Sequence, residues 1–188
     1  MVDNKRSPSN PRQKVLFPNL NNAESDVSDD AVDFLTNGFQ IKNNDSSWNN
    51  NGGTYLYIAF ASDASSTTPA LADSFANKLY TGTGSARSIA GLGFQPNLTW
   101  IKDRSATRDH NLTDSVRGVT HPIYMTTGAQ LTNSTFLTSF DSDGFSLGNQ
   151  AAANENGETF VAWNWKANPL PTINTDGDTQ AIVSANVA

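Results

Sequence analysis

Alternation of apolar and polar residues over short stretches is the dominant pattern of this chain, and it predicts β-strands. The two clearest stretches are residues 54–60, TYLYIAF, and residues 159–165, TFVAWNW, both rich in aromatic and branched side chains. Side chains of these types suit a pleated and largely buried surface. Shorter stretches of the same kind predict further strands at 31–35, 39–41, 86–90, 98–102, 135–140 and 145–147.

Polar turns separate these stretches. Asn37-Gly38 and Asp143-Gly144 each lie between two expected strands, and such pairs favour tight hairpins because glycine, asparagine and aspartate tolerate positive φ. No extended helix is indicated, and only residues 69–77 fit a helical turn. Short strands joined by polar turns at this spacing predict an all-β chain folded as an antiparallel sandwich.

The pattern around these two turns occurs twice in the same order. Residues 35–61 correspond to residues 141–167, so that Gly38 matches Gly144, 106 positions later (144 − 38). A period near one hundred residues is too long for a solenoid repeat and suits a tandem array of domains. We therefore interpret the chain as containing two copies of one domain.

The repeat predicts where the domains begin and end. Residues 73–113 precede Asp114 in the second copy, whereas only two residues precede the corresponding Asp3 in the first. The expected division is 1–61 as the C-terminal half of a first repeat, 62–72 as a linker, 73–167 as a complete second repeat, and 168–188 as a linker with the opening strand of a further repeat. The chain is then either a fragment of a longer protein, or its half-domain is completed by another chain.

A half-domain of this kind would need cover. A sandwich with one sheet missing leaves unpaired strand edges and an apolar face in water, and proteins normally cover both. The aromatic stretch 54–60 would be the exposed one. We expect other chains to cover it, with residues 172–188 as one segment able to supply a strand.

Composition excludes several classes of function. Only 16% of the 188 residues are charged and the formal net charge is −6, so no basic surface for a nucleic acid is expected. The chain has no cysteine, which excludes disulfides and thiol chemistry. It has no apolar run long enough to span a membrane, and its basic N-terminus lacks the apolar segment of a secretory signal.

Two features resemble sites but are interpreted as structural. Asp141-Ser142-Asp143-Gly144 resembles the start of a calcium loop, yet the further oxygen ligands and the closing glutamate are missing, and the first copy has no carboxylate there. Charged residues and His110 cluster between Lys102 and Arg117. No second carboxylate or nucleophile motif accompanies the histidine, so we expect a solvated loop rather than acid–base chemistry. We predict that the chain is not an enzyme and binds no metal and no cofactor.

An aspartate and an arginine recur three residues apart in both copies. They are Asp3 with Arg6 and Asp114 with Arg117. A local charge-assisted contact that braces a turn explains this recurrence without any ligand. We therefore predict that both pairs are structural turn pairs.

Trp48 is the candidate for ligand binding. It lies in an Asn-rich loop, NNDSSWNNNGG, where no core residue is expected. A tryptophan among amides and hydroxyls fits three roles: it stacks on a sugar ring, it anchors a neighbouring subunit, or it folds back onto its own sandwich. The sequence leaves all three open.

Longer segments resemble a known family. GLGFQPNLTWIKDRSATRDHNLTDSVRG, SFDSDGFSLG and ENGETFVAWNWKA resemble a repeated domain of bacteriophage tail-fibre and other virion-appendage proteins, especially those of marine and cyanobacterial phages. DNKRSPSNPRQKVLFPNLNNAE, VDFLTNGFQI and GGTYLYIAFA are similar to a sister version of that domain. The resemblance implies a lectin-like antiparallel β-sandwich, used in tandem as virion building material and often placed near host-recognition tips.

The resemblance also implies a function. We expect a structural protein on the exterior of a phage particle, in a tail fibre or other appendage, that adheres to a host cell-surface glycan. Its expected partners are other virion proteins and further copies of itself in a homo-oligomer, with no nucleic acid and no membrane insertion. A capsid-surface decoration protein is the alternative. A glycan depolymerase is a third hypothesis, which would need paired carboxylates across a groove.

Overall fold

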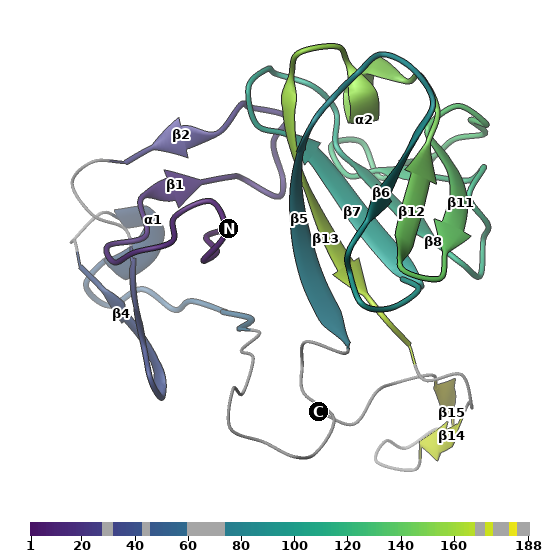
Figure 1. Cartoon of the computed structure of the whole chain (residues 1–188). Helices are drawn as coiled ribbons and strands as arrows, with labels where there is room; N and C mark the ends of the chain where they lie inside the picture. The colour runs from purple at the N-terminus through teal and green to yellow at the C-terminus, as the bar shows by residue number, and fades with distance from the viewer. Residues whose placement is uncertain (28–31, 43–45, 60–73, 168–171, 175–180, 184–188) are drawn as a thin grey trace.

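The structure is a computed structural model, and it describes residues 1–27, 32–42, 46–59, 74–167, 172–174 and 181–183 (Figure 1). Strands and loops make up nearly all of it. The two helices, α1 (Ser46–Asn49) and α2 (Ala151–Asn154), have four residues each. Every strand pairing among the described residues is antiparallel, so the predicted all-β, antiparallel class is confirmed.

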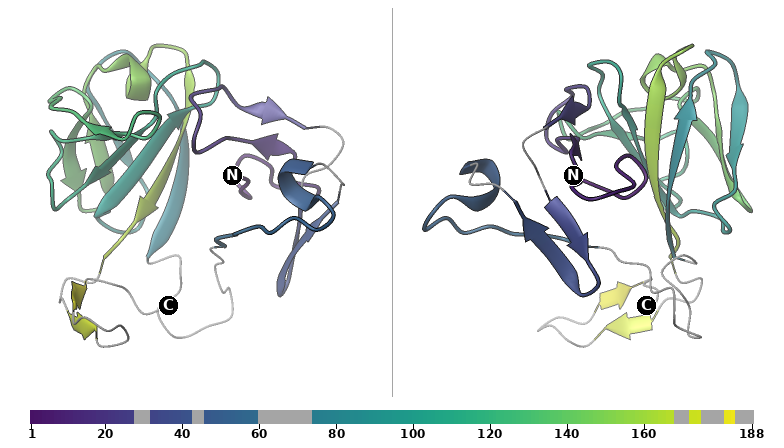
Figure 2. Two further views of the ribbon diagram at one scale, coloured as in Figure 1. Left: turned by 180° about the vertical axis from the view of Figure 1, so that it is seen from behind. Right: turned by 60° about the vertical axis from the view of Figure 1, so that its left-hand side comes forward.

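Two sheets in the second half of the chain form a sandwich (Figures 1 and 2). The larger sheet has the strand order β10-β9-β8-β7-β13-β5, and the smaller has the order β11-β12-β6. The strands are β5 (Phe75–Thr81), β6 (Arg87–Ala90), β7 (Leu98–Asp103), β8 (Asn111–Asp114), β9 (Ile123–Tyr124), β10 (Ala129–Gln130), β11 (Leu137–Asp141), β12 (Gly144–Leu147) and β13 (Thr159–Trp165).

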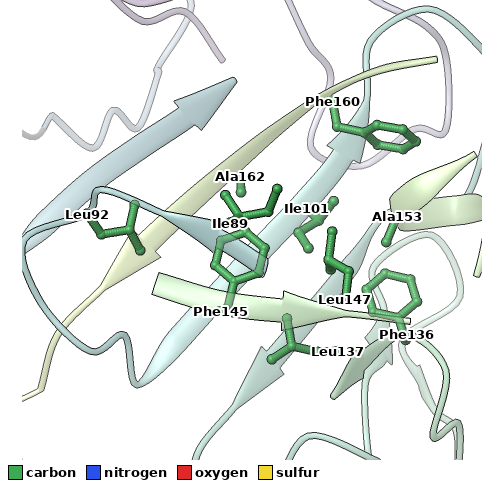
Figure 3. Packing of buried hydrophobic residues seen from close by; sticks show 10 residues of the cluster. All are labelled: Ile89, Leu92, Ile101, Phe136, Leu137, Phe145, Leu147, Ala153, Phe160 and Ala162. Atoms are coloured by element: carbon green, nitrogen blue, oxygen red, sulfur yellow. The ribbon is translucent and has the colours of Figure 1, made fainter. Parts of the chain in front are cut away.

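Side chains from both sheets meet in one apolar core (Figure 3). Ile89 and Phe145 come from the smaller sheet, and Ile101, Phe160 and Ala162 come from the larger. All five are buried. Alternate residues of each strand enter this core because successive side chains of a strand point to opposite faces.

The opposite face of the larger sheet is covered by the N-terminal segment, residues 1–27. Val161 and Trp163 of β13 point away from the core, and Leu16 packs against both. All three side chains are buried. The guanidinium of Arg6 lies over the Trp163 ring, 5.6 Å from its centroid. The N-terminal segment therefore gives the larger sheet a second covered face.

The rest of the first half consists of short hairpins. Strands β1 (Lys14–Val15) and β2 (Ser25–Asp26) pair with each other. Strands β3 (Val32–Leu35) and β4 (Gly38–Ile41) form the next pair. At the C-terminal side of the chain, β14 (Thr172–Asn174) pairs with β15 (Ala181–Val183).

The order of elements in the first half matches that in the second. The β1–β2 hairpin, the β3–β4 hairpin and α1 follow one another as β9–β10, β11–β12 and α2 do. Next to the turn of each longer hairpin lies a cross-strand aromatic pair, Phe34 with Phe39 and Phe140 with Phe145. Similar local sequences therefore form similar local structures in the two halves.

Most predicted strands are confirmed. Seven predicted ranges contain or overlap a strand. In chain order these strands are β3, β4, β6, β7, β11, β12 and β13, and the ranges are 31–35, 39–41, 86–90, 98–102, 135–140, 145–147 and 159–165. The pattern does not predict β5, which has a mixed composition, or β8, whose side chains are mostly polar. It also does not predict the two-residue strands β1, β2, β9 and β10.

The strand predicted at 54–60 is wrong over its described part, residues 54–59, which form no strand pairing. The corresponding strand β13 pairs with β5 on one side and β7 on the other. The described residues of the first half include no counterpart of either neighbour. A strand needs a partner for its backbone groups, so a strand-forming sequence alone does not make one.

The helical turn predicted at 69–77 is also wrong where it is described. Residues 75–77 belong to β5, in which Phe75 pairs with Trp165 of β13, so sheet pairing overrides the weak local preference for a helix. Residues 69–73 and the predicted linker 62–72 lie outside the described residues.

Candidate binding site

A polar pocket of about 320 Å³ lies where the N-terminal segment meets the loops of the sandwich. Its lining residues are Asn21, Thr107, Arg108, Asp109, Tyr124, Gln150, Ala151 and Ala152. They come from the N-terminal segment, the loop between β7 and β8, strand β9, and the start of α2. The folded chain, rather than one sequence motif, therefore builds this pocket.

Buried Asp103 fixes the loop between β7 and β8. Its Oδ1 accepts hydrogen bonds from the backbone N–H groups of Ser105 and Ala106, each at 2.9 Å. Its Oδ2 lies 3.2 Å from Nε of Arg108, and Nη2 of Arg108 lies 3.6 Å from Oε2 of Glu155. Two carboxylates thus lie beside the Arg108 guanidinium at the wall of the pocket and attract it by charge, without a hydrogen bond from Nε.

Asp109 and Gln150 bring further polar groups to the pocket. The hydroxyl of Thr126 donates to Oδ1 of Asp109 at 2.6 Å, which orients the carboxylate. Gln150 directly precedes α2, but its side chain does not cap that helix. A carboxylate, a guanidinium, amides and a tyrosine ring are the groups that hydrogen-bond and stack on a polyhydroxylated ligand.

Glu24 ties the N-terminal segment to the sandwich. Arg104 Nε and Nη2 donate to the two Glu24 oxygens at 2.9 and 2.8 Å, and Arg6 Nη1 donates to Oε2 at 3.2 Å. Burial alone would raise the pKa of Glu24, but the hydrogen bonds and charges of Arg104 and Arg6 outweigh it and lower that pKa. The segment that carries Asn21 is therefore fixed against the β7–β8 loop, so the pocket is formed before any ligand binds.

Two ionisable side chains are fully buried close to the pocket. Lys102 Nζ donates to the carbonyl oxygen of Leu20 at 2.9 Å, and Trp100 Nε1 donates to Nδ1 of His110 at 2.8 Å. Burial lowers the pKa of Lys102 to about 8. Burial, with the nearby Lys102 charge, lowers the pKa of His110 to about 4. The expectation of a solvated loop between Lys102 and Arg117 is therefore wrong, because the N-terminal segment covers part of it.

We expect His110 to make the folded state less stable as the pH falls from 6.5 towards 4. The imidazole stays neutral when folded but takes up a proton when unfolded, because its folded pKa is about 4 against an ordinary value of 6.5. The unfolded state then binds more protons, so the unfolding free energy increases with pH across this window. The contribution of His110 is about 2 kcal/mol between pH 5 and pH 7.

Urea unfolding at pH 5 and pH 7 measures this effect. The variant His110→Gln keeps an acceptor for Trp100 but does not titrate, so its stability should change less between the two pH values than that of the unmodified chain. His121→Gln is the matched control and should keep the full pH dependence. An unchanged pH dependence in His110→Gln would exclude His110 as its source.

The two predicted turn pairs lie outside the pocket lining and have similar geometry. Oδ1 of Asp3 accepts the backbone N–H of Arg6 at 2.9 Å, and Oδ1 of Asp114 accepts that of Arg117 at 2.8 Å. The side chains also pair, with Arg6 Nε 2.7 Å from Oδ2 of Asp3 and an Arg117 guanidinium nitrogen on Oδ2 of Asp114. Each aspartate thus holds its own turn.

Trp48 also lies away from the pocket. It is half-buried and packs against a small cluster that includes Val15 and Val32. Of the three roles left open by the sequence, this placement corresponds to a tryptophan folded back onto its own domain. Two lining residues, Arg108 and Asp109, belong to the charged cluster that we interpret from the sequence as structural. The other lining residues are scattered in sequence and carry no motif, so none of them is a sequence candidate.

The aspartates of the calcium-like segment bind protein groups. Asp143 accepts the backbone N–H groups of Gly91 and Gly93 at 3.0 and 2.6 Å. Asp141 accepts the hydroxyls of Ser139 and Ser146 at 2.6 and 2.7 Å. Within the described ranges, no three acidic, histidine or cysteine side chains are grouped to hold a metal. No helix in the described part of the chain is long and apolar enough to cross a membrane.

Comparison with known proteins gives one family. A family model described as a domain of unknown function (DUF7483) matches residues 1–64 and 70–188. The interval between the two matched segments falls within the predicted linker, residues 62–72. No curated protein and no solved structure matches the chain.

Proposed function

The chain belongs to the DUF7483 family, and we propose that it is a structural and adhesive component on the exterior of a phage particle, in a tail fibre or other appendage. Its ligand is a host cell-surface glycan, and its partners are other virion proteins and further copies of itself. The sequence resemblance to phage appendage domains supports the virion part. The polar pocket at the junction of the two halves carries the adhesive part.

We further propose that the chain is a tandem array, with the second half of one repeat followed by a complete repeat. The shared order of hairpins and helix in residues 1–59 and 111–167 supports this organisation. The similar Asp3–Arg6 and Asp114–Arg117 turns support it as well. Tandem sandwiches of this kind suit an elongated appendage because each unit adds length without needing a new fold.

The pocket has the size and chemistry of a site for a sugar residue. Its volume is about 320 Å³, and it is a shallow hollow that is mostly open to solvent, so a sugar would be contacted from one side. Sugar hydroxyls both donate and accept, so they can bond the Asp109 carboxylate, the Arg108 guanidinium and the Gln150 amide together. The Tyr124 ring offers an apolar surface to the carbon face of a sugar.

The lining favours binding over hydrolysis. Asp109 is the only carboxylate among the described residues that line the pocket. Glycoside hydrolases of the usual kind place two carboxyl groups on opposite sides of the scissile bond. We therefore propose adhesion, and the depolymerase hypothesis has no support from this pocket.

We expect the purified chain to bind glycans extracted from the host cell surface, and Asp109→Ala and Gln150→Ala each to weaken binding by about tenfold. Each change removes hydrogen bonds to the sugar, and a loss of about 1.4 kcal/mol corresponds to tenfold in Kd. Biolayer interferometry on immobilised glycan measures the affinities. Asp26→Ala removes a carboxylate that is 60% exposed and lies outside the pocket lining, so it should bind like the unmodified chain.

The absence of binding by the unmodified chain, or equal binding by all three variants, would contradict the glycan site. The place on the particle is tested separately by gold-labelled antibodies on intact virions. Label on fibres or other appendages supports the proposal, whereas label on the shell supports the alternative of a capsid-surface decoration protein. Virions without any label would contradict both.

A further inference from the structure

Residues 54–59 have the sequence of a central strand but the surroundings of a surface loop. Thr54 matches Thr159, 105 positions later (159 − 54), so these residues correspond to residues 159–164 of β13, which lies between β5 and β7 in the larger sheet. Leu56 is 93% exposed and Ile58 is 77% exposed. Their counterparts Val161 and Trp163 are 0% and 2% exposed. So large an exposed apolar stretch marks a surface that is normally covered.

The stretch already has the two-faced arrangement of β13. The Tyr57 ring packs edge-on against Phe39 of β4, with ring centroids 5.0 Å apart. The hydroxyl of Tyr55 donates to the carbonyl oxygen of Ser46 at 2.7 Å. Both tyrosines thus contact the β3–β4 hairpin or α1, on the side that corresponds to the core side of β13, but Tyr55 and Tyr57 remain 44% and 70% exposed, whereas Phe160 is buried. Leu56 and Ile58 alternate with them, so the features that are missing are the strand neighbours and the cover of the outer face.

A second vacant edge lies on the β3–β4 hairpin. In the second half, β6 runs beside β12, and a Cβ added to Gly144 would lie 1.9 Å from the carbonyl oxygen of Ile89. Gly38 is the first residue of β4, as Gly144 is of β12, and a Cβ added there would meet no atom of the described residues within 4 Å. The edge of β4 that corresponds to the β6 side of β12 is therefore open at this residue.

The three missing neighbours belong to one segment of chain. The strands β5, β6 and β7 all lie within residues 74–113. We propose that the first half is an acceptor for a segment with the pattern of residues 74–113, that is, the N-terminal half of another unit of this family. The segment pairs on both sides of residues 54–59 and along the edge of β4.

A second copy of this chain does not fit as the donor. Its own β5 and β7 are already paired with β13, from Phe75 to Thr81 and from Leu98 to Asp103. No further strand pairs with the outer edge of β5 among the described residues, but this edge would add a strand on one side only. Two-sided pairing requires a segment whose strands are not yet used. This inference concerns assembly and does not depend on the glycan pocket.

The test adds a second copy of residues 74–113 in front of residue 1 of the full chain. Amide hydrogen exchange of residues 55–59, followed by mass spectrometry, compares this fusion with the original chain. We expect exchange to slow by about 100-fold or more in the fusion, because strand pairing protects amides up to the opening free energy of the sheet. Residues 159–165 should exchange slowly in both proteins and show that the second half is intact.

A matched control carries Leu79→Pro and Ile101→Pro in the added copy only. Proline removes a backbone N–H and cannot sit in a central strand, so exchange at residues 55–59 should return to the rate of the original chain. Fast exchange in the fusion, or slow exchange in the proline control, would overturn the proposal. The proposal would also be overturned if residues 55–59 of the original chain exchanged slowly and this protection disappeared on dilution. That result would mean that a second copy of the chain pairs with residues 54–59.

Discussion

Gly144→Ala is expected to destabilise the sandwich by more than about 3 kcal/mol, whereas Gly38→Ala is expected to change stability by less than about 0.5 kcal/mol. A Cβ at Gly144 would lie 1.9 Å from the backbone oxygen of Ile89. That oxygen belongs to the paired strand β6, so it cannot move away without loss of the β12–β6 pairing. At Gly38 the same methyl group would enter open space.

Urea unfolding followed by tryptophan fluorescence measures this difference. Trp100, Trp163 and Trp165 lie in the larger sheet of the second half, and Trp48 packs against Val15 and Val32 in the first half, so the signal reports on both halves. The two glycines hold the same place in two similar hairpins, which makes each variant the control for the other. Equal losses of stability at Gly38 and Gly144 would show that a neighbouring strand does not cause the effect.

Asn154→Ala is expected to destabilise the sandwich by about 3 kcal/mol, because it removes the partner of three backbone groups. The Asn154 side chain is buried, and its Nδ2 donates to the carbonyl oxygens of Ser85 and Gly148 at 2.7 Å each. Its Oδ1 accepts the backbone N–H of Thr83 at 3.0 Å. The side chain thus joins the β5–β6 loop to the end of β12, and alanine would leave these groups unpaired.

Thermal and urea unfolding of Asn154→Ala measure this loss. Asn156→Ala is the control, since Asn156 is exposed and lies two residues after Asn154, beyond the end of α2. Its stability should stay within about 0.5 kcal/mol of the original. Equal stability of Asn154→Ala and Asn156→Ala would contradict this prediction. It would mean that water replaces all three hydrogen bonds and that the Asn154 side chain does not stabilise the fold.

The local pattern predicts which residues can form strands, but their neighbours decide which of them do. The β11–β12 hairpin is predicted at the correct place, but its turn is Ser142-Asp143, because Gly144 already belongs to β12 and pairs with Asp141. The stretch 54–59 has an equally clear pattern and forms no strand, because no neighbour is present among the described residues. β5 shows the opposite case: its sequence, FANKLYT, has a weak pattern, but pairing with β13 makes it a strand.

The pocket could not be predicted from the sequence for a related reason. Asn21, Asp109 and Gln150 are far apart along the chain and belong to no motif. They meet because Leu16 packs on β13 and Glu24 pairs with Arg104, and neither contact leaves a signal in the sequence. The cluster between Lys102 and Arg117 does mark the correct region. Its burial, however, depends on the N-terminal segment that covers it.

The cover that residues 1–27 place over the larger sheet has a mechanical consequence. A force applied to the first half is transmitted to the sandwich through the Leu16 contact and the Glu24–Arg104 ion pair. These contacts act in addition to the covalent connection between the halves. To pivot at this joint, the halves must first separate an apolar contact and an ion pair together. Part of any tension along the chain therefore acts on the face of the larger sheet. The joint also resists bending more than a joint formed by a peptide linker alone.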